Sequence, residues 1–347
     1  MKYSKVYIKS IGYELAPVVV TSTELESRLE PLYKTLHFTP GQLYTLTGIN
    51  ERRWWEPGSL LSDGATVAAE KAIENSGVKI EDIGALVYTG VCREQFEPAT
   101  ACRVASNLGI HGSVPIYDIS NACLGVLNGI LDIANRIELG QIRAGLIVSC
   151  ESAREINELM INRMLEEKNM ERFASSLATL TGGSGAVAVL LTDGSFPEKQ
   201  GHKLLGGVTE AAPEHHGLCL WGISPDKNGK FVQTMSTDGV NVMNHGVELG
   251  KQTWENFLKE MNWSQKEVDK VVCHQVGSTH QAAILKALNI DPGKDFTTYE
   301  SLGNIGTVSL PITLVLAAER DEISKGNKVG LLGIGSGLNC LMLGVEW

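Results

Sequence analysis

The amino-acid sequence predicts a duplicated five-layered α/β/α/β/α sandwich, in which two similar halves each contribute a sheet and its helices. A helix followed by a strand in the first half recurs in the second half with each position 185 residues later, as for Ala72 and Phe257. A second helix–strand pair repeats without gaps at the same offset, as for Gly145 and Gly330. One such match could arise by chance, but two that share an offset favour gene duplication.

The first repeated unit begins where Ser62 and Asp63 can cap a helix, and Gly77 is expected to end that helix. A buried strand, Ala85 to Thr89, follows it. The matching strand in the second half is Lys270 to Cys273. Apolar residues recur at helical spacing before both strands: Ala65, Ala68, Ala69, Ala72 and Ile73 in the first half, and Val247, Trp254, Phe257, Leu258 and Met261 in the second.

The second repeated unit consists of a strongly apolar helix and the strand after it. The strands are expected at residues 143–147 and 328–332, and a further strand at Ala186 to Leu191 follows a glycine-rich turn. Both helices are apolar on nearly every side, which predicts that they are buried between layers. The matched helix positions are Leu127, Ile130 and Leu131 in the first half and Ile312, Val315 and Leu316 in the second.

These units divide the chain into a first half at residues 1–195, with an insertion at 151–180, and a second half at residues 196–347. The only linker-like stretch is LTDGSFPEKQGHK, residues 191–203. Strands that alternate with helices imply parallel or mixed sheets that are covered on both faces. An ordinary doubly wound sheet with a second domain is the alternative that the pattern leaves open.

Composition narrows the class of protein. The chain has 347 residues, 43% of them apolar and 20% charged, a composition typical of a globular protein. Its net charge of −10 argues against a surface that binds nucleic acid. There is no apolar run of about 18 residues and no signal-peptide pattern. Seven cysteines without a CxxC pair indicate neither a disulfide framework nor a zinc site. We therefore expect a cytoplasmic protein with reduced thiols and no membrane span.

Cys123 is the candidate nucleophile. A strand, Val114 to Ile119, runs through three small or polar residues into a long apolar helix, so the thiol is expected at a helix N-terminus. Unpaired N–H groups and the positive end of the helix dipole favour the thiolate there, and the thiolate is the reactive form. A buried structural cysteine is the alternative, and it is the commoner fate of a single cysteine.

Two polar residues in the second half are candidates for the same site. His274 follows the strand Lys270 to Cys273, and ligands of open α/β sheets bind at such strand ends. Asn304 precedes the second buried helix, which matches the helix that Cys123 opens. Either residue could instead be an ordinary hydrogen-bonded loop residue. Their positions relative to the repeat favour one shared central site.

The C-terminal segment GIGSGLNC, Gly333 to Cys340, follows another strand. It cannot be a dinucleotide-binding fingerprint, because only ten residues remain after Gly337 and no βαβ unit follows. A tight loop whose N–H groups face an oxyanion is the better interpretation. No metal site is predicted, because no HExxH or EF-hand motif occurs and the adjacent pair His215 and His216 has the wrong spacing to share a metal from one helix face.

Four segments in this order, NACLG, VCHQV, GNIGTVS and GIGSGLN, resemble the ketoacyl-synthase III branch of the thiolase superfamily over essentially the whole chain. Within that branch the sequence is most similar to the acyl-CoA condensing enzymes of bacterial long-chain olefin biosynthesis. The segments GINERRWW, EPATA, HQVGSTH and GIGSGLNC carry this narrower resemblance.

The resemblance implies a thiolase-like fold and a role for each candidate. Cys123 would take the first acyl chain from its CoA, and His274 and Asn304 would hold the carbonyl of the second thioester and stabilise its enolate. The backbone N–H groups of Cys123 and Ser336 would form the oxyanion hole. Glu97 would enter the active site of a dimer partner and remove the C2 proton of the second chain. A homodimer is therefore implied.

Glu97 distinguishes the close relatives. Synthases that initiate fatty-acid synthesis decarboxylate malonyl-carrier protein and need no base, and a hydrophobic residue generally stands at this position. Joining two unactivated acyl-CoAs requires removal of a weakly acidic C2 proton, for which a desolvated carboxylate is suited. Considered without the resemblance, Glu97 would be an exposed acid in a loop before Pro98.

The sequence departs from the family in one respect. Many initiating synthases grip the CoA nucleotide with a tryptophan and an arginine, whose positions fall near Gln42 and Leu46 here. Because both residues are absent, the residues that hold CoA stay unassigned. Arg52, Arg53 and Trp54 lie close by in the sequence.

The insertion at 151–180 resembles a lid over the acyl channel. Its apolar residues include adaptable methionines that would suit flexible alkyl chains, or they could simply be packing residues: Leu159, Met160, Ile161, Met164, Leu165, Phe173 and Leu177.

The resemblance therefore implies an acyltransferase that joins two long-chain acyl-CoAs by non-decarboxylative Claisen condensation, the first step of long-chain olefin biosynthesis. The product would be a 2-alkyl-3-ketoacyl thioester, or the acid after hydrolysis. CoA would be the substrate carrier, with no other cofactor. A carrier-protein donor and downstream pathway enzymes as partners stay open. The alternatives are a decarboxylating 3-oxoacyl-acyl-carrier-protein synthase III, a non-catalytic acyl-thioester binding protein, and a thiol redox sensor.

Overall fold

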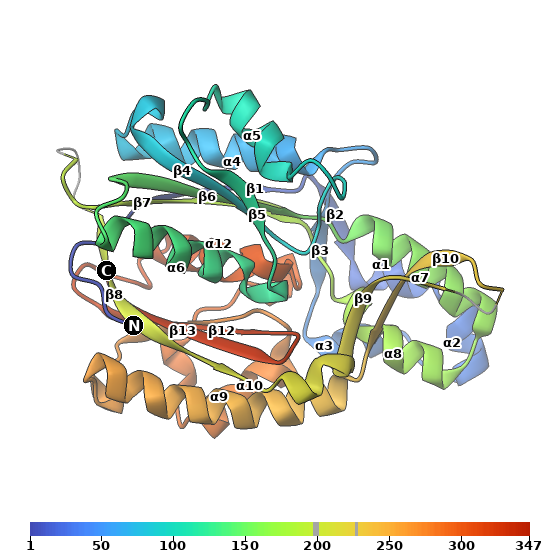
Figure 1. The fold of residues 1–347 in the computed structure, drawn as a ribbon. Coiled ribbons are helices and arrows are strands. Elements are labelled where there is room, and N and C mark those ends of the chain that lie inside the picture. Colours follow the sequence, from blue (N-terminus) through green and yellow to red (C-terminus); the bar gives the residue numbers. More distant parts are fainter. Residues whose placement is uncertain (197–200, 226–227) are drawn as a thin grey trace.

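The computed structural model describes residues 1–196, 201–225 and 228–347, and it shows five stacked layers (Figure 1). One outer layer contains α4 (Leu61–Ser76) and α5 (Thr100–Leu108), and the opposite outer layer contains α9 (Gly239–Met261) and α10 (Ser278–Ala287). Two β layers lie inside these helices. The central layer consists of α6 (Gly125–Glu138) and α12 (Ser309–Glu319).

The first β layer has the strand order β5-β4-β6-β7-β1. Strand β4 is parallel to both β5 and β6, whereas β7 is antiparallel to β6 and β1. Nearly every residue of β4, β6 and β7 is buried, as expected for strands covered on both faces. The strand bounds are β1 Tyr7–Leu15, β4 Ile83–Thr89, β5 Ile116–Ile119, β6 Ala144–Glu151 and β7 Gly185–Thr192.

The second β layer has the order β11-β12-β13-β8, with β11 parallel to β12 and the other neighbours antiparallel. Its strands repeat the order and directions of β4, β6, β7 and β1. Two residue pairs between β1 and β8 join the layers into one nine-stranded sheet. The bounds are β8 His202–Ala211, β11 Lys270–Cys273, β12 Lys328–Gly335 and β13 Asn339–Glu346.

The predicted five-layered duplicated sandwich is therefore confirmed. The boundary between halves near residue 195 stays a prediction, and residues 197–200 of the expected linker lie outside the described residues. The cap expected from Ser62 and Asp63 was wrong in detail. Helix α4 begins one residue earlier, and the carboxylate of Glu94 accepts a hydrogen bond from the backbone N–H of Ser62 at 2.8 Å. Gly77 does end the helix, in a left-handed conformation with φ of 68°.

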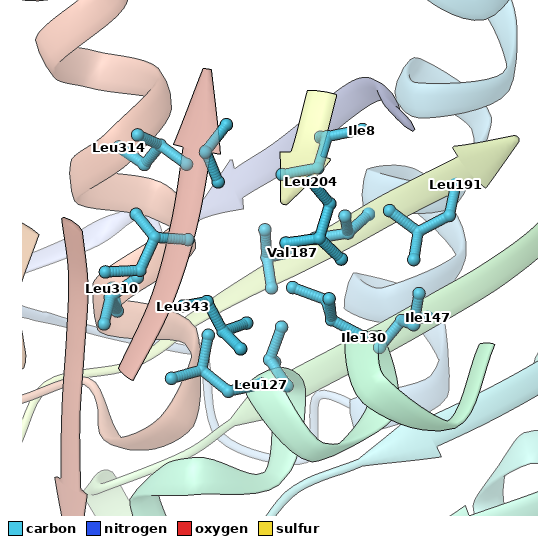
Figure 2. Close-up of a cluster of buried hydrophobic side chains, with 14 of the residues drawn as sticks. Ile8, Leu127, Ile130, Ile147, Val187, Leu191, Leu204, Leu310, Leu314 and Leu343 are labelled. Atoms are coloured by element: carbon cyan, nitrogen blue, oxygen red, sulfur yellow. The ribbon is translucent and has the colours of Figure 1, made fainter. Parts of the chain in front are cut away.

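The core lies where the halves meet. Side chains from α6 and α12 interdigitate with side chains from β7 and β13, as Leu127, Ile130, Leu310, Val187 and Leu343 do in Figure 2. Both helices are buried over most of their length, as their apolar sequences predicted. Cys123 and Asn304 lie just before these two helices in the chain, so the buried core holds the elements that position them.

Replacing Leu314 in this core by alanine is expected to lower the free energy of unfolding by about 2–5 kcal/mol, because Leu314 is 1% exposed and its removal leaves a cavity. Leu139→Ala is the matched control, since Leu139 is 74% exposed and its truncation should change stability by less than about 0.5 kcal/mol. Denaturant unfolding of both variants measures the difference. Equal effects would contradict this description of the core.

A group of smaller elements packs beside the sandwich (right of Figure 1). Helices α1, α2, α7 and α8 and strand β3 share a separate apolar cluster, which the hairpin of β9 and β10 adjoins. The bounds are β2 Val18–Thr21, β3 Glu51–Trp54, β9 Cys219–Pro225, β10 Phe231–Thr237, α1 Ser22–Arg28, α2 Glu30–Leu36, α3 Gln42–Thr47, α7 Arg154–Glu167, α8 Met170–Leu180 and α11 Tyr299–Leu302. Among the described residues, no helix is both long enough and apolar enough to cross a membrane.

Candidate active site

A cavity of about 530 Å³ lies at the edge of the sandwich beneath the smaller elements. Cys123, His274, Asn304 and Ser336 all line it, although they come from four separate segments of the chain. The structure thus brings together four of the five residues predicted for the site. The fifth, Glu97, does not line the cavity.

Cys123 lies in a single 3-10 turn, Ala122–Leu124, that leads directly into α6. The predicted position at a helix start is therefore confirmed. Ala122 adopts a left-handed conformation with φ of 45°, which is costly for a residue with a Cβ atom. This sharp turn points the chain from β5 into the helix, and the backbone N–H of Leu124 bonds the carbonyl of Asn121 at 2.9 Å.

The expected stabilisation of the thiolate does not hold for the ligand-free chain. The pKa of Cys123 is raised to about 12, mainly by burial and to a smaller extent by nearby Cys219 and Glu151, whereas its own backbone N–H lowers it. The effect of the helix end on the pKa is outweighed because desolvation of the sulfur disfavours the charged thiolate. At neutral pH Cys123 is therefore a thiol, and its proton must leave as the acyl group arrives.

The GIGSGLNC segment is a tight connection between β12 and β13, as its sequence predicted. A hydrogen bond of 3.2 Å from the Asn339 side chain to Asn121 ties this turn to the turn that carries Cys123. Gly335 lies so close to Cys123 that a Cβ atom there would stand 3.3 Å from the Cys123 backbone nitrogen. Ser336 follows Gly335, so the predicted partners of the oxyanion hole lie beside each other.

His274 follows β11, and its backbone N–H bonds Leu332 of β12 at 3.0 Å. The ring Nδ1 lies 2.8 Å from Ser309 Oγ at the start of α12, which leaves Nε2 as the ring nitrogen available to a ligand. Burial, and secondarily His280, lower the pKa of His274 to about 4. The imidazole is therefore neutral at physiological pH. It can donate one hydrogen bond from Nε2 when Nδ1 accepts from Ser309.

Asn304 is held through its backbone by the end of α8. Its N–H bonds the carbonyl of Thr181, and its own carbonyl accepts from Gly183, both at 2.9 Å. The side-chain oxygen accepts from the backbone N–H of Gly306 at 3.1 Å. This bond uses the side-chain oxygen of Asn304, and Asn304 lines the same cavity as His274, so its amide NH₂ is a candidate second donor there.

The walls of the cavity are mainly apolar and come largely from elements far apart in sequence. Leu177 of α8, Trp221 and Met235 of the β9–β10 hairpin, Met243 of α9 and Ile284 of α10 all contribute. Only Leu177 belongs to the predicted set of lid residues. Met164 packs instead in the cluster shared by α1, α2, α7 and α8, and Met160 is fully buried but is not among the residues that line the cavity.

Glu97 lies in an exposed segment between β4 and α5, and its neighbour Phe96 is 89% exposed. The segment is anchored on both sides, because Glu94 bonds Ser62 and Asp118 accepts from the backbone N–H groups of Thr100 and Ala101 at 2.9 Å. Within a single chain, then, Glu97 does not meet Cys123.

The three residues noted near the family's CoA-gripping positions, Arg52, Arg53 and Trp54, have contacts within the protein. Arg52 is fully buried, and its guanidinium bonds Val20 and Ser22. Arg53 bonds the carbonyl of Ala16, and the Trp54 indole bonds that of Gly182. Their place in strand β3 thus makes them structural. Of the two positions where the family has a CoA grip, Leu46 lines the cavity and exposes 37% of its surface.

Sequence reasoning missed two residues that shape the site. Ser309 orients His274, and Glu151 is a carboxylate that is only 4% exposed and lines the same cavity. A signal for Glu151 was present, because it is an acid directly at the end of an unbroken apolar strand. The signal for Ser309 was weaker, since serine is common at helix starts.

The fold and the site together define a thiolase-like condensing enzyme, which is an acyltransferase. Residues 258–347 match the family model for the C-terminal region of 3-oxoacyl-[acyl-carrier-protein] synthase III. The chain is 58% identical to the acyl-CoA:acyl-CoA alkyltransferase of Shewanella oneidensis and 37% identical to that of Xanthomonas campestris, with full coverage of each chain. The chain therefore belongs to the acyl-CoA:acyl-CoA alkyltransferase family.

A solved structure supports the same assignment. The crystal structure of a cysteine-to-serine variant of Xanthomonas campestris OleA, with bound lauric acid and lauroyl-CoA, superimposes with a TM-score of 0.92 at 36% identity, covering 99% of this chain and 100% of that chain. The resemblance drawn from the four sequence motifs is thus confirmed in both its broad and its narrow form.

Proposed function

We infer that the protein joins two acyl-CoAs by non-decarboxylative Claisen condensation, the first step of long-chain olefin biosynthesis. The observation that carries this inference is a thiol, a neutral imidazole and a carboxamide lining one apolar cavity, in a chain that matches acyl-CoA:acyl-CoA alkyltransferases over its whole length. A non-catalytic binding protein would need none of these three groups. A redox sensor would need a resolving cysteine in a polar, accessible setting.

The first half-reaction forms the acyl-enzyme. The sulfur of Cys123 attacks the carbonyl carbon of an acyl-CoA, and the tetrahedral oxyanion is stabilised by the backbone N–H groups of Cys123 and Ser336. The carbon–sulfur bond to CoA then breaks. The proton of the Cys123 thiol leaves with CoA as its free thiol, so no other reactant is consumed.

The second half-reaction forms the carbon–carbon bond. The carbonyl of a second acyl-CoA accepts hydrogen bonds from His274 and Asn304, which makes its C2 proton more acidic. Removal of that proton by a carboxylate gives an enolate, and the enolate carbon attacks the acyl group on Cys123. The thiolate of Cys123 is expelled and regains a proton, and the 2-alkyl-3-ketoacyl-CoA departs.

We propose that the base is Glu97 of a second copy of this chain, and that the enzyme works as a homodimer. Support comes from the exposed position of the segment around Phe96 and Glu97, outside the cavity of its own chain. We also propose CoA as the only carrier, no further cofactor, and a cytoplasmic location. All seven cysteines are free thiols in the structure, which fits a reducing compartment.

Incubation of the purified protein with myristoyl-CoA alone tests the proposed function. We expect release of free CoA together with a condensed product that contains both alkyl chains, detected by mass spectrometry. The matched sample contains malonyl-carrier protein as well, and its addition should not raise turnover. Turnover that begins only with malonyl-carrier protein would instead identify a decarboxylating synthase.

A further inference from the structure

Glu151 is the last residue of β6, and its carboxylate is buried between the two loops that carry catalytic candidates. One loop follows β4 and leads to Glu97. Its backbone N–H groups at Val91 and Cys92 donate to the two oxygens of Glu151 at 3.0 and 3.1 Å. Because a carboxylate oxygen is a strong acceptor in a buried setting, these bonds fix the start of the Glu97 segment on the strand end.

The other loop carries Asn304. A Cβ atom on Gly306 would stand 3.1–3.2 Å from the side chain of Glu151, and the backbone N–H of the next residue, Thr307, lowers the pKa of the same carboxylate. Gly306 in turn donates to the side-chain oxygen of Asn304. The carboxylate of Glu151 therefore sets the position of the backbone group that orients the Asn304 amide.

The turn that carries the nucleophile is connected to this arrangement as well. The hydroxyl of Thr307 accepts a hydrogen bond of 2.7 Å from the backbone N–H of Val126, three residues after Cys123. One buried carboxylate thus touches the Glu97 segment and the Asn304 loop directly, and it reaches the start of α6 through Thr307. No other carboxylate described in the structure occupies a comparable place between these segments.

Resting on the proposed function, we propose that Glu151 is a positioning residue for the condensation step. It holds the Asn304 loop of its own site and the segment that carries Glu97 toward the partner's site, so in a homodimer each site depends on the Glu151 of both subunits. Acylation of Cys123 needs neither the Glu97 carboxylate nor the second thioester. Condensation needs the base and the Asn304 amide placed correctly at the same moment, so it should depend far more strongly on Glu151.

The test is to measure the two half-reactions separately in Glu151→Gln. The variant keeps the size of the side chain but replaces one accepting oxygen by an NH₂ group, which cannot accept from a backbone N–H. We expect acylation, followed by intact mass and by CoA release in a single turnover, to stay within about 3-fold of wild type. Formation of the condensed product should fall about 10²-fold, which is the usual effect of displacing a catalytic group by about 1 Å.

Glu151→Asp keeps the charge and shortens the side chain, so it should show the same separation of the two steps if Glu151→Gln does not fold.

Glu26→Gln is the matched control. Glu26 is also a buried carboxylate, 6% exposed, and accepts from the backbone N–H groups of Gly41 and Leu43, but it lies far from the Glu97 segment. It should lower thermal stability without separating acylation from condensation.

Equal loss of acylation and condensation in the folded Glu151 variants, or no loss of either, would overturn the proposal. This outcome is distinct from failure of the proposed function. In that case the wild-type protein itself would release no CoA and make no condensed product from acyl-CoA alone.

Discussion

Replacing Cys123 by alanine is expected to abolish acylation and to lower formation of the condensed product by at least about 10³-fold, because Cys123 is the thiol that lies at a helix start beside the Gly335–Ser336 turn. The cavity should still bind acyl-CoA, since its apolar walls are unchanged. Intact-mass analysis after exposure to myristoyl-CoA measures the adduct, and product analysis measures the condensation. Undiminished condensation in this variant would remove the basis of the proposed mechanism.

Cys219 provides the control for this experiment. Its sulfur lines the same cavity and raises the pKa of Cys123, but it lies at the start of β9 rather than before a helix. Cys219→Ala should therefore still take up one acyl group. If the adduct were lost in Cys219→Ala and kept in Cys123→Ala, the nucleophile would have been assigned to the wrong thiol.

The parts of the fold that depend on local pattern were predictable. Strand β11 occupies the predicted residues Lys270–Cys273, and β7 exceeds its predicted range by one residue at each end. Strand β5 begins at Ile116, two residues later than expected. Val114 precedes Pro115, which has no backbone N–H to donate to a neighbouring strand, so the pairing of β5 starts after the proline. The repeat settled the order of layers, because duplicated units bury equivalent faces.

The parts of the site that depend on distant segments were not predictable. The pKa of Cys123 is set by burial under α8 and the β9–β10 hairpin, and nothing near position 123 in the sequence indicates that cover. Arg52 and Trp54, to which the sequence assigned no contacts, are both buried in strand β3, which pairs with β2. The motifs thus located the reacting groups. Tertiary packing determined the pKa of Cys123 and which neighbouring residues hold the site in place.

Replacing Glu97 by glutamine is expected to leave acylation of Cys123 intact and to lower condensation by about 10²–10⁴-fold, the usual contribution of a general base. Glutamine has nearly the same shape but cannot take up the C2 proton. Acyl-enzyme should therefore accumulate in this variant and be visible by intact mass. Loss of acylation would show that Glu97 acts in substrate binding or in the first half-reaction instead.

Mixed dimers decide whether Glu97 acts across the subunit interface. Neither Cys123→Ala nor Glu97→Gln should condense as a homodimer. A dimer with one subunit of each kind contains one site in which an intact Cys123 faces an intact Glu97 from its partner. Random mixing should therefore restore about one quarter of wild-type condensation, as half of the dimers are mixed and each has one working site. If Glu97 served its own chain, no site in the mixture would be complete, and condensation would stay at the level of the separate variants.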